Sequence, residues 1–197
     1  AKSGFEMVLR SRKQESADAM VAALEKTLAR QVERGKLEQA TADEVRARVT
    51  ATDHLGALVD CDLVIESVVE DLAVKKPLFA ELDSVVKDSA ILATNTSTLP
   101  VVDMAVATER PDRVCGVHFF NPAPAMALVE IVRPLTASDE TIAAVTEFAS
   151  ACGKNPVQVK DQAGFIVNAL LFPYLNNAVR LLENGTATAE DIDTAMK

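Results

Sequence analysis

Short apolar runs rich in β-branched residues alternate along this chain with amphipathic helical segments, and this alternation restricts the fold more than any other feature. The runs at 63–69 (LVIESVV), 90–94 (AILAT) and 128–132 (LVEIV) have the length and composition of buried strands. Between such runs lie stretches such as 17–33, where apolar residues recur at helical spacing. Strands that alternate with crossover helices form a parallel sheet. We therefore predict an α/β fold with a doubly wound, mostly parallel sheet.

The remaining elements are expected from periodicity and from capping and turn residues. Thr41 and Glu44 form a T-x-x-E capping box at the start of a short helix. Pro77 is placed in the first turn of its helix, because an interior proline costs about 3 kcal/mol. Ser138 can cap a helix, and Pro173 is expected to kink one. Further strands are expected at 5–9, 114–118 and 157–160, and helices at 17–33, 41–49, 76–86, 100–107, 139–151 and 164–183.

The pattern changes from mixed α/β to all-helical near Asp161. Ahead of this point strands and helices alternate, whereas the long helical stretch 164–183 is followed by Thr188, which begins another helix. We therefore predict two units: a sheet domain over residues 1–161 and the start of a helical domain over 162–197.

The composition argues against several classes of partner. Twenty Lys and Arg against 29 Asp and Glu give a net charge of −9, which disfavours nucleic acid. The longest apolar stretch, 164–172, is interrupted by Asn168 and falls short of the ~18 residues of a membrane span. The three cysteines, Cys61, Cys115 and Cys152, have no C-x-x-C spacing, so we expect reduced thiols in a cytoplasmic protein and no metal site.

The residue types suited to catalysis gather where predicted strands end. Ser97 lies in the segment 95–98 (NTST) that follows AILAT, and His118 begins H-F-F-N-P at the end of another strand. Ligands of open parallel sheets bind outside the carboxyl ends of the strands, so both segments are expected to face one crevice. Glu130 lies among large aliphatic residues, where a charge needs a partner. His118 is the nearest candidate, and a carboxylate bonded to one ring nitrogen makes the other nitrogen a general base.

Several segments occur together in the order and spacing of the 3-hydroxyacyl-CoA dehydrogenase family. They are N-T-S at 95–97, H-F-F-N-P at 118–122, the Glu130 segment, D-Q-A-G-F-I-V-N at 161–168 and E-D-I-D at 190–193. The chain resembles the short-chain, 3-hydroxybutyryl-CoA branch over essentially its whole length. This resemblance implies a Rossmann-type fold and hydride transfer between C3 of a short-chain 3-hydroxyacyl-CoA and NAD or NADP, in fatty-acid or butanoate metabolism. It also implies a homodimer when the protein is full length.

The family pattern assigns roles to individual residues of this chain. His118 matches the general base that takes the 3-hydroxyl proton, and Glu130 matches its partner. Ser97 matches the serine that bonds the reacting group, and Asn168 matches the asparagine that places the histidine and the thioester carbonyl. The matches to cofactor contacts are Glu70, Lys75, Ser97 and Asn121, and those to contacts with the CoA tail are Thr27 and Arg34.

The cofactor preference is predicted from the residues that follow the strand at 5–9. In NAD-selective members of the family an acidic residue ends this strand and accepts from the ribose hydroxyls. That position falls on Ser11, which is flanked by Arg10 and two further basic residues whose charge suits a 2′-phosphate. NADPH is therefore predicted to be accepted at least comparably to NADH. In the alternative interpretation these charges are solvated, and Glu15 or Asp18 replaces the acid.

Other residues also have structural explanations. Ser97 could be a helix N-cap, and Asn168 could be a helix residue bonded to backbone. Lys75 and Lys76 could form a solvated helix face. The whole chain could be a non-catalytic structural relative of the same fold, or a dehydrogenase of a free hydroxy acid.

Two features of the family pattern are missing from these residues. The G-x-G-x-x-G turn that cradles the cofactor pyrophosphate should precede Ala1, together with the first strand of the sheet. The helical domain of the family continues beyond the position of Lys197. We therefore expect the chain to be a fragment of a longer enzyme and to be inactive alone.

Overall fold

A computed structural model describes all residues from 1 to 197. The strands are β1 (Met7–Arg10), β2 (Val49–Thr52), β3 (Leu63–Glu66), β4 (Ile91–Thr94), β5 (Val114–Phe119), β6 (Leu128–Arg133) and β7 (Asn155–Lys160). The helices are α1 (Gln14–Glu33), α2 (Gln39–Ala47), α3 (Leu72–Val85), α4 (Val101–Ala105), α5 (Asp139–Ala151), α6 (Val167–Glu183) and α7 (Ala189–Ala195). Short 3₁₀ turns, η1 (Leu55–Leu58) and η2 (Pro111–Arg113), precede β3 and β5.

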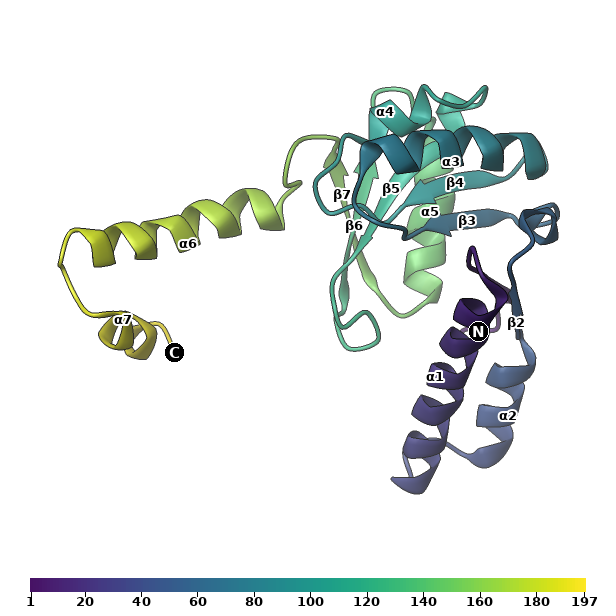
Figure 1. The fold of residues 1–197 in the computed structure, drawn as a ribbon, viewed down its shortest axis with the longest axis horizontal. Helices are drawn as coiled ribbons and strands as arrows, with labels where there is room; N and C mark the ends of the chain where they lie inside the picture. The colour runs from purple at the N-terminus through teal and green to yellow at the C-terminus, as the bar shows by residue number, and fades with distance from the viewer.

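The strands form one large and one small sheet (Figure 1). The large sheet has the order β3-β4-β5-β6-β7, and all its pairs are parallel except β5 with β6. The small sheet is the parallel pair β1-β2. The predicted α/β fold with a mostly parallel, Rossmann-type sheet is therefore confirmed.

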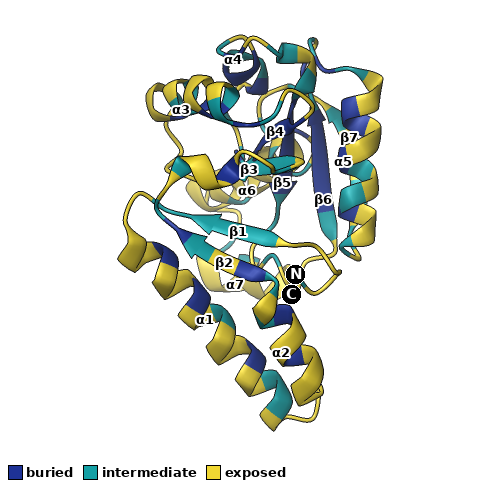
Figure 2. Cartoon of the chain, turned by 90° about the vertical axis from the view of Figure 1, so that its right-hand side faces the viewer, coloured by how far each residue is buried: buried dark blue, intermediate teal, exposed yellow.

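Alternate residues of the large sheet face two separate cores, as a sheet covered on both sides requires. Leu92, Val114 and Val132 pack in a cluster with residues of α3 and α4. Ala93 and Cys115 belong to a second cluster on the other face, which includes residues of α5. Figure 2 shows this central part of the sheet as buried, between helices whose outer faces are exposed.

Helix α5 begins and ends where the sequence predicts. Ser138 is its N-cap, because the Ser138 hydroxyl accepts a hydrogen bond from the Thr141 N–H at 3.1 Å. The chain leaves the helix through Gly153, whose φ of 72° lies in the left-handed region that glycine tolerates best. The local capping residues were therefore sufficient to predict both ends of α5.

The segment 41–49 differs from its prediction. Helix α2 begins at Gln39, so Thr41 lies inside the helix, and the N-cap residue Glu38 makes no side-chain cap. The predicted capping box of Thr41 and Glu44 is therefore wrong. The helix ends at Ala47, and the following V-T-A-T forms β2, a strand that the prediction lacks. These four residues include two threonines, so they lack the apolar run by which the other strands were predicted. Pairing with β1 stabilises them as a strand.

Helix α3 begins earlier than predicted, at Leu72. Asp71 caps it, since the Asp71 carboxylate accepts from the Ala73 N–H at 2.8 Å. Pro77 consequently lies inside the helix and not in its first turn, so the carbonyl of Ala73 lacks its usual helical donor. Full burial of Phe79 in the core helps to offset this cost.

Helices α6 and α7 extend away from the sheet domain (Figure 1). Helix α6 contains Pro173, and the kink expected there stays a prediction. Many of its apolar side chains are exposed, among them Leu170, Phe172 and Leu175. None of the helices combines the length and apolar composition that a membrane span requires.

The three cysteines are expected to differ in reactivity. Complete burial in β5 raises the pKa of the Cys115 thiol to about 12, because the low-dielectric interior disfavours the thiolate. Cys61 and Cys152 are only partly buried. In the folded chain at pH 8, iodoacetamide should therefore alkylate Cys61 and Cys152 but spare Cys115, as peptide mass spectrometry would show. In urea all three should react, and labelling of Cys115 at the same rate in folded protein would contradict this assignment.

Candidate active site

His118 and Glu130 form a buried pair at the centre of the sheet. They are direct partners in the antiparallel register of β5 and β6, so their side chains emerge on the same face. His118 Nδ1 lies 2.8 Å from Glu130 Oε2, and both residues are buried. The predicted partnership of these two residues is therefore confirmed by their geometry.

The second oxygen of Glu130 anchors the start of α6. Glu130 Oε1 accepts hydrogen bonds from the N–H groups of Ile166 and Val167, each at 3.0 Å. The chain reaches this position through a tight turn in which Gly164 has a φ of 78°. A Cβ at Gly164 would lie 2.8 Å from the Ala169 backbone nitrogen, so only glycine fits. One carboxylate thus joins the histidine to the segment that leads into the helices.

Two aromatic rings enclose the imidazole. The ring centroids of Phe120 and Phe165 lie 4.4 Å and 5.6 Å from that of His118. The Nε2 atom of His118 has no hydrogen-bond partner within the chain, whereas Nδ1 is held by Glu130. A carboxylate at Nδ1 favours the tautomer with its proton on Nδ1, which leaves Nε2 as the basic atom. The pair can therefore accept a proton from a ligand.

Ser97 and Asn168 come together from distant parts of the chain. Asn168, in the first turn of α6, donates from Nδ2 to the Ser97 carbonyl at 3.3 Å. The Ser97 hydroxyl makes no hydrogen bond within the chain, so it is free to bind a ligand. The alternative of a Ser97 helix cap is wrong, because the first N–H groups of α4 bind the Asp161 carboxylate instead. Asn168 does bond to backbone, as its structural alternative proposed.

Glu70 and Lys75 lie beside the Ser97 loop. The Glu70 carboxylate accepts from the Ser97 N–H at 2.8 Å and from the Thr96 hydroxyl, and lies 3.3 Å from Lys75 Nζ. Partial burial alone would raise the pKa of Glu70, but these hydrogen bonds and the Lys75 ammonium hold it below its usual value. Lys75 is only 1% exposed, so the alternative of a solvated helix face is wrong for it.

The remaining predicted contacts lie at the ends of other strands. Asn121 follows β5 and is exposed. Asn95, which follows the neighbouring strand β4, accepts a hydrogen bond from the Phe119 N–H at 2.8 Å. Ser11 follows β1, with its N–H bonded to the Thr52 carbonyl at 3.1 Å. Arg10 donates from Nε to the Asp53 carbonyl at 3.3 Å. The end of β5 lies at the edge of the large sheet where the sequence predicts ligand binding, whereas Arg10 and Ser11 lie at the end of β1 in the small sheet.

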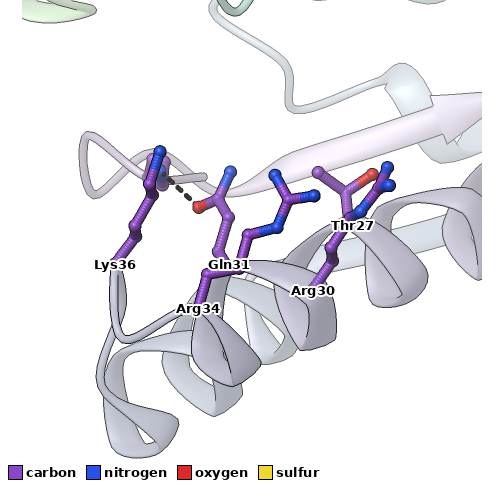
Figure 3. Close-up of a pocket in the computed structure, with 6 residues that line it drawn as sticks. Thr27, Arg30, Gln31, Arg34 and Lys36 are labelled. Carbon is purple, nitrogen blue, oxygen red and sulfur yellow. Dashed lines mark hydrogen bonds between the residues drawn. The ribbon is translucent and has the colours of Figure 1, made fainter.

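Thr27 and Arg34 share a basic pocket on α1 (Figure 3). The pocket has a volume of about 390 Å³ and no hydrophobic side chain in its lining. It is lined by Lys2, Thr27, Arg30, Gln31, Arg34 and Lys36. Four of these six residues are cations, and Lys2 is held in place by a 3.0 Å hydrogen bond to Gln31. An anionic ligand suits this composition.

Sequence reasoning missed two carboxylates near the site. Glu66 ends β3 within the apolar run 63–69 and is buried, and a charge in an apolar run is the same signal that identified Glu130. Asp161 binds the N–H groups of Val101 and Val102 at 3.0 and 2.7 Å. No local pattern indicates that contact, because 60 residues separate Asp161 from Val101.

Comparison with known proteins gives consistent results. Residues 1–162 match the family model for the 3-hydroxyacyl-CoA dehydrogenase NAD binding domain, and residues 164–197 match that for the 3-hydroxyacyl-CoA dehydrogenase C-terminal domain. The chain is 43% identical to 3-hydroxybutyryl-CoA dehydrogenase of Clostridioides difficile over 197 residues, which is all of this chain and 70% of that protein. It is 48% identical to the enzyme of the same name from Mycobacterium tuberculosis over 188 residues, 92% of this chain and 66% of that protein.

A solved structure agrees with the sequence matches. The crystal structure of (S)-3-hydroxybutyryl-CoA dehydrogenase PaaH1 from Ralstonia eutropha superposes with a TM-score of 0.97 at 36% identity. The match covers 100% of this chain and 69% of that one. The chain thus spans about two thirds of the length of these relatives.

Proposed function

Because this chain belongs to the 3-hydroxyacyl-CoA dehydrogenase family, we propose that its site serves hydride transfer between C3 of a short-chain 3-hydroxyacyl-CoA and NAD(P). The observation that carries the proposal is the buried pair of His118 and Glu130, with Nδ1 and Oε2 2.8 Å apart. This pair is a general base with its orienting carboxylate.

Each side chain of the site has its own proposed role. His118 takes the 3-hydroxyl proton at Nε2, and Glu130 stabilises the imidazolium that forms. The free Ser97 hydroxyl bonds the reacting oxygen, and Asn168, held by the Ser97 carbonyl, orients the thioester carbonyl. Phe120 and Phe165 keep water from the imidazole.

The residues present suit the nicotinamide half of NAD(P). NAD(P), when bound, takes up the hydride that leaves C3. Glu70, Ser97 and Asn121 follow β3, β4 and β5, at the edge where dinucleotides bind in this fold. The seven glycines include no G-x-G-x-x-G turn, so these 197 residues lack those donors for the pyrophosphate.

The test is oxidation of NADH or NADPH by acetoacetyl-CoA. It uses a completed chain, in which these residues are joined to the segments of the Clostridioides difficile relative that lie outside the match. Turnover that depends on the CoA ester supports the proposal. Turnover with free acetoacetate alone would indicate a hydroxy-acid dehydrogenase, and no turnover with either would indicate a non-catalytic relative.

The basic pocket on α1 is proposed to bind the phosphates of CoA. Arg34→Ala in the completed chain should raise KM for acetoacetyl-CoA roughly tenfold, the effect of losing one charge-assisted hydrogen bond. The KM for acetoacetyl-pantetheine, which lacks the nucleotide, should not change. Lys26→Ala, on the same helix but outside the pocket, is the matched control. Equal losses with both thioesters would rule out a phosphate site.

The residue that follows β1 is proposed to admit NADPH. Ser11 carries no charge that would repel a 2′-phosphate, and the exposed Arg12 and Lys13 can attract one. The completed chain should use NADPH at least comparably to NADH. Ser11→Asp should shift kcat/KM towards NADH by roughly tenfold, whereas Ser16→Asp, an equal charge on the exposed start of α1, should not. A parent chain that already favours NADH more than a hundredfold would contradict this proposal.

A further inference from the structure

Glu66 is a buried carboxylate to which the proposed chemistry gives no role. It ends β3, and its side chain is only 1% exposed. Its two oxygens accept from Lys75 Nζ at 2.7 and 2.9 Å, and Oε2 also accepts from the Thr94 hydroxyl at 2.8 Å. Glu66 Oε1 also accepts a hydrogen bond from the Val68 N–H. A buried charge with this many donors is held in a single position.

Lys75 Nζ lies between the carboxylates of Glu66 and Glu70. An ammonium group has three N–H donors, and Lys75 Nζ lies within 3.3 Å of three carboxylate oxygens, two from Glu66 and one from Glu70. The 41% exposure of the Glu70 side chain contrasts with the 1% of Lys75. Lys75 therefore links the buried Glu66 to the more exposed Glu70.

Two hydrogen-bonded branches run from Glu66 to the same loop. One passes through Lys75 and Glu70 to the Thr96 hydroxyl and the Ser97 N–H. The other passes through the Thr94 hydroxyl, which accepts from the Thr96 N–H at 3.2 Å. We propose that Glu66 is a positioning residue that fixes the loop carrying Ser97. The inference rests on the proposed function, in which Ser97 binds the reacting oxygen.

The charges predict that a neutral residue at position 66 would disturb the loop that carries Ser97. Lys75 is shared between two carboxylates, and Glu70 keeps enough freedom to accept from the loop. In Glu66→Gln the ammonium has Glu70 as its only anion, so Glu70 is drawn towards Lys75 and away from the Ser97 N–H. Even a small displacement of a group that orients substrate can lower turnover by roughly 10²-fold.

The first measurement uses the 197-residue chain itself. Amide hydrogen exchange of Thr96 and Ser97, followed by NMR, should be roughly tenfold faster in Glu66→Gln, because losing one buried hydrogen bond to a charged group has about this effect. The matched control is Asp83→Asn, on helix α3, which also carries Lys75. Asp83 pairs with Arg110, both side chains are at most 14% exposed, and neither contacts the Ser97 loop. This variant should lose stability without faster exchange at Ser97.

The second measurement is kinetic and uses the completed chain. Glu66→Gln should lower kcat for acetoacetyl-CoA by roughly 10-fold to 10²-fold, while Asp83→Asn retains the parent value. If Glu66→Gln does not fold, Thr94→Val is the second variant, since it removes the other branch with little change in shape. It should speed exchange at Thr96.

The outcomes separate the positioning role from the proposed function. Unchanged exchange at Thr96 and Ser97 in Glu66→Gln, or in Thr94→Val where the first variant does not fold, would overturn the positioning role. So would kinetics identical to those of Asp83→Asn. A parent chain without dehydrogenase activity would instead contradict the proposed function, and the exchange result would still decide the role of Glu66.

Discussion

Replacing His118 with alanine in the completed chain is expected to lower turnover of acetoacetyl-CoA by roughly 10²–10⁴-fold, the usual contribution of a general base. Nδ1 of His118 is bonded to Glu130, and Nε2 has no partner within the chain, so no neighbouring group can replace it. NADPH affinity should change little, because the histidine acts on the substrate proton. Steady-state kinetics and a fluorescence titration of the cofactor measure both quantities.

The sequence provides a matched control for this substitution. The only other histidine, His54, has a side chain that is 86% exposed and that pairs with Asp53 and not with Glu130. His54→Ala should therefore leave turnover unchanged. His118→Ala also leaves the Glu130 carboxylate buried without its partner, so turnover is compared at a temperature where circular dichroism shows both variants folded. Parent-like turnover by His118→Ala would end its assignment as the base.

The large sheet and the His118 pair could be predicted because their signals are local and strong. Strands β3 and β4 are apolar on both faces, which only a covered sheet explains. A charge inside an apolar strand requires a partner, and that requirement linked Glu130 to His118 before any register was known. The same rule applied to Glu66 would have indicated that this carboxylate needs a cationic or donor partner, which the structure shows to be Lys75.

Long-range contacts account for what the sequence did not predict. Strand β2 is defined by its parallel pairing with β1. In this pairing Val49 lies opposite Met7, which is about forty residues earlier in the sequence. The cap of α4 comes from Asp161, so the chain around Pro100 contains no sign of it. Local propensity could not have indicated these contacts.

Glu130→Gln is expected to separate the two functions that one carboxylate performs. Oε2 faces His118 Nδ1, and Oε1 accepts from the N–H groups of Ile166 and Val167, so both oxygens must be acceptors. An amide has one acceptor and one donor. If its oxygen stays on the N–H groups, its NH₂ faces Nδ1, and the ring proton moves to Nε2, where it blocks proton uptake.

The expected result is a loss of turnover by roughly 10²-fold, smaller than that of His118→Ala, because the flipped amide can still accept from Nδ1–H. Asp161→Asn is the matched control, as the Asp161 carboxylate also accepts from two backbone N–H groups but does not contact His118. Both variants should lose about 1–3 kcal/mol of unfolding free energy, measured by urea denaturation. Only Glu130→Gln should lower kcat for acetoacetyl-CoA, and parent-like turnover by that variant would show that Glu130 anchors α6 without assisting the histidine.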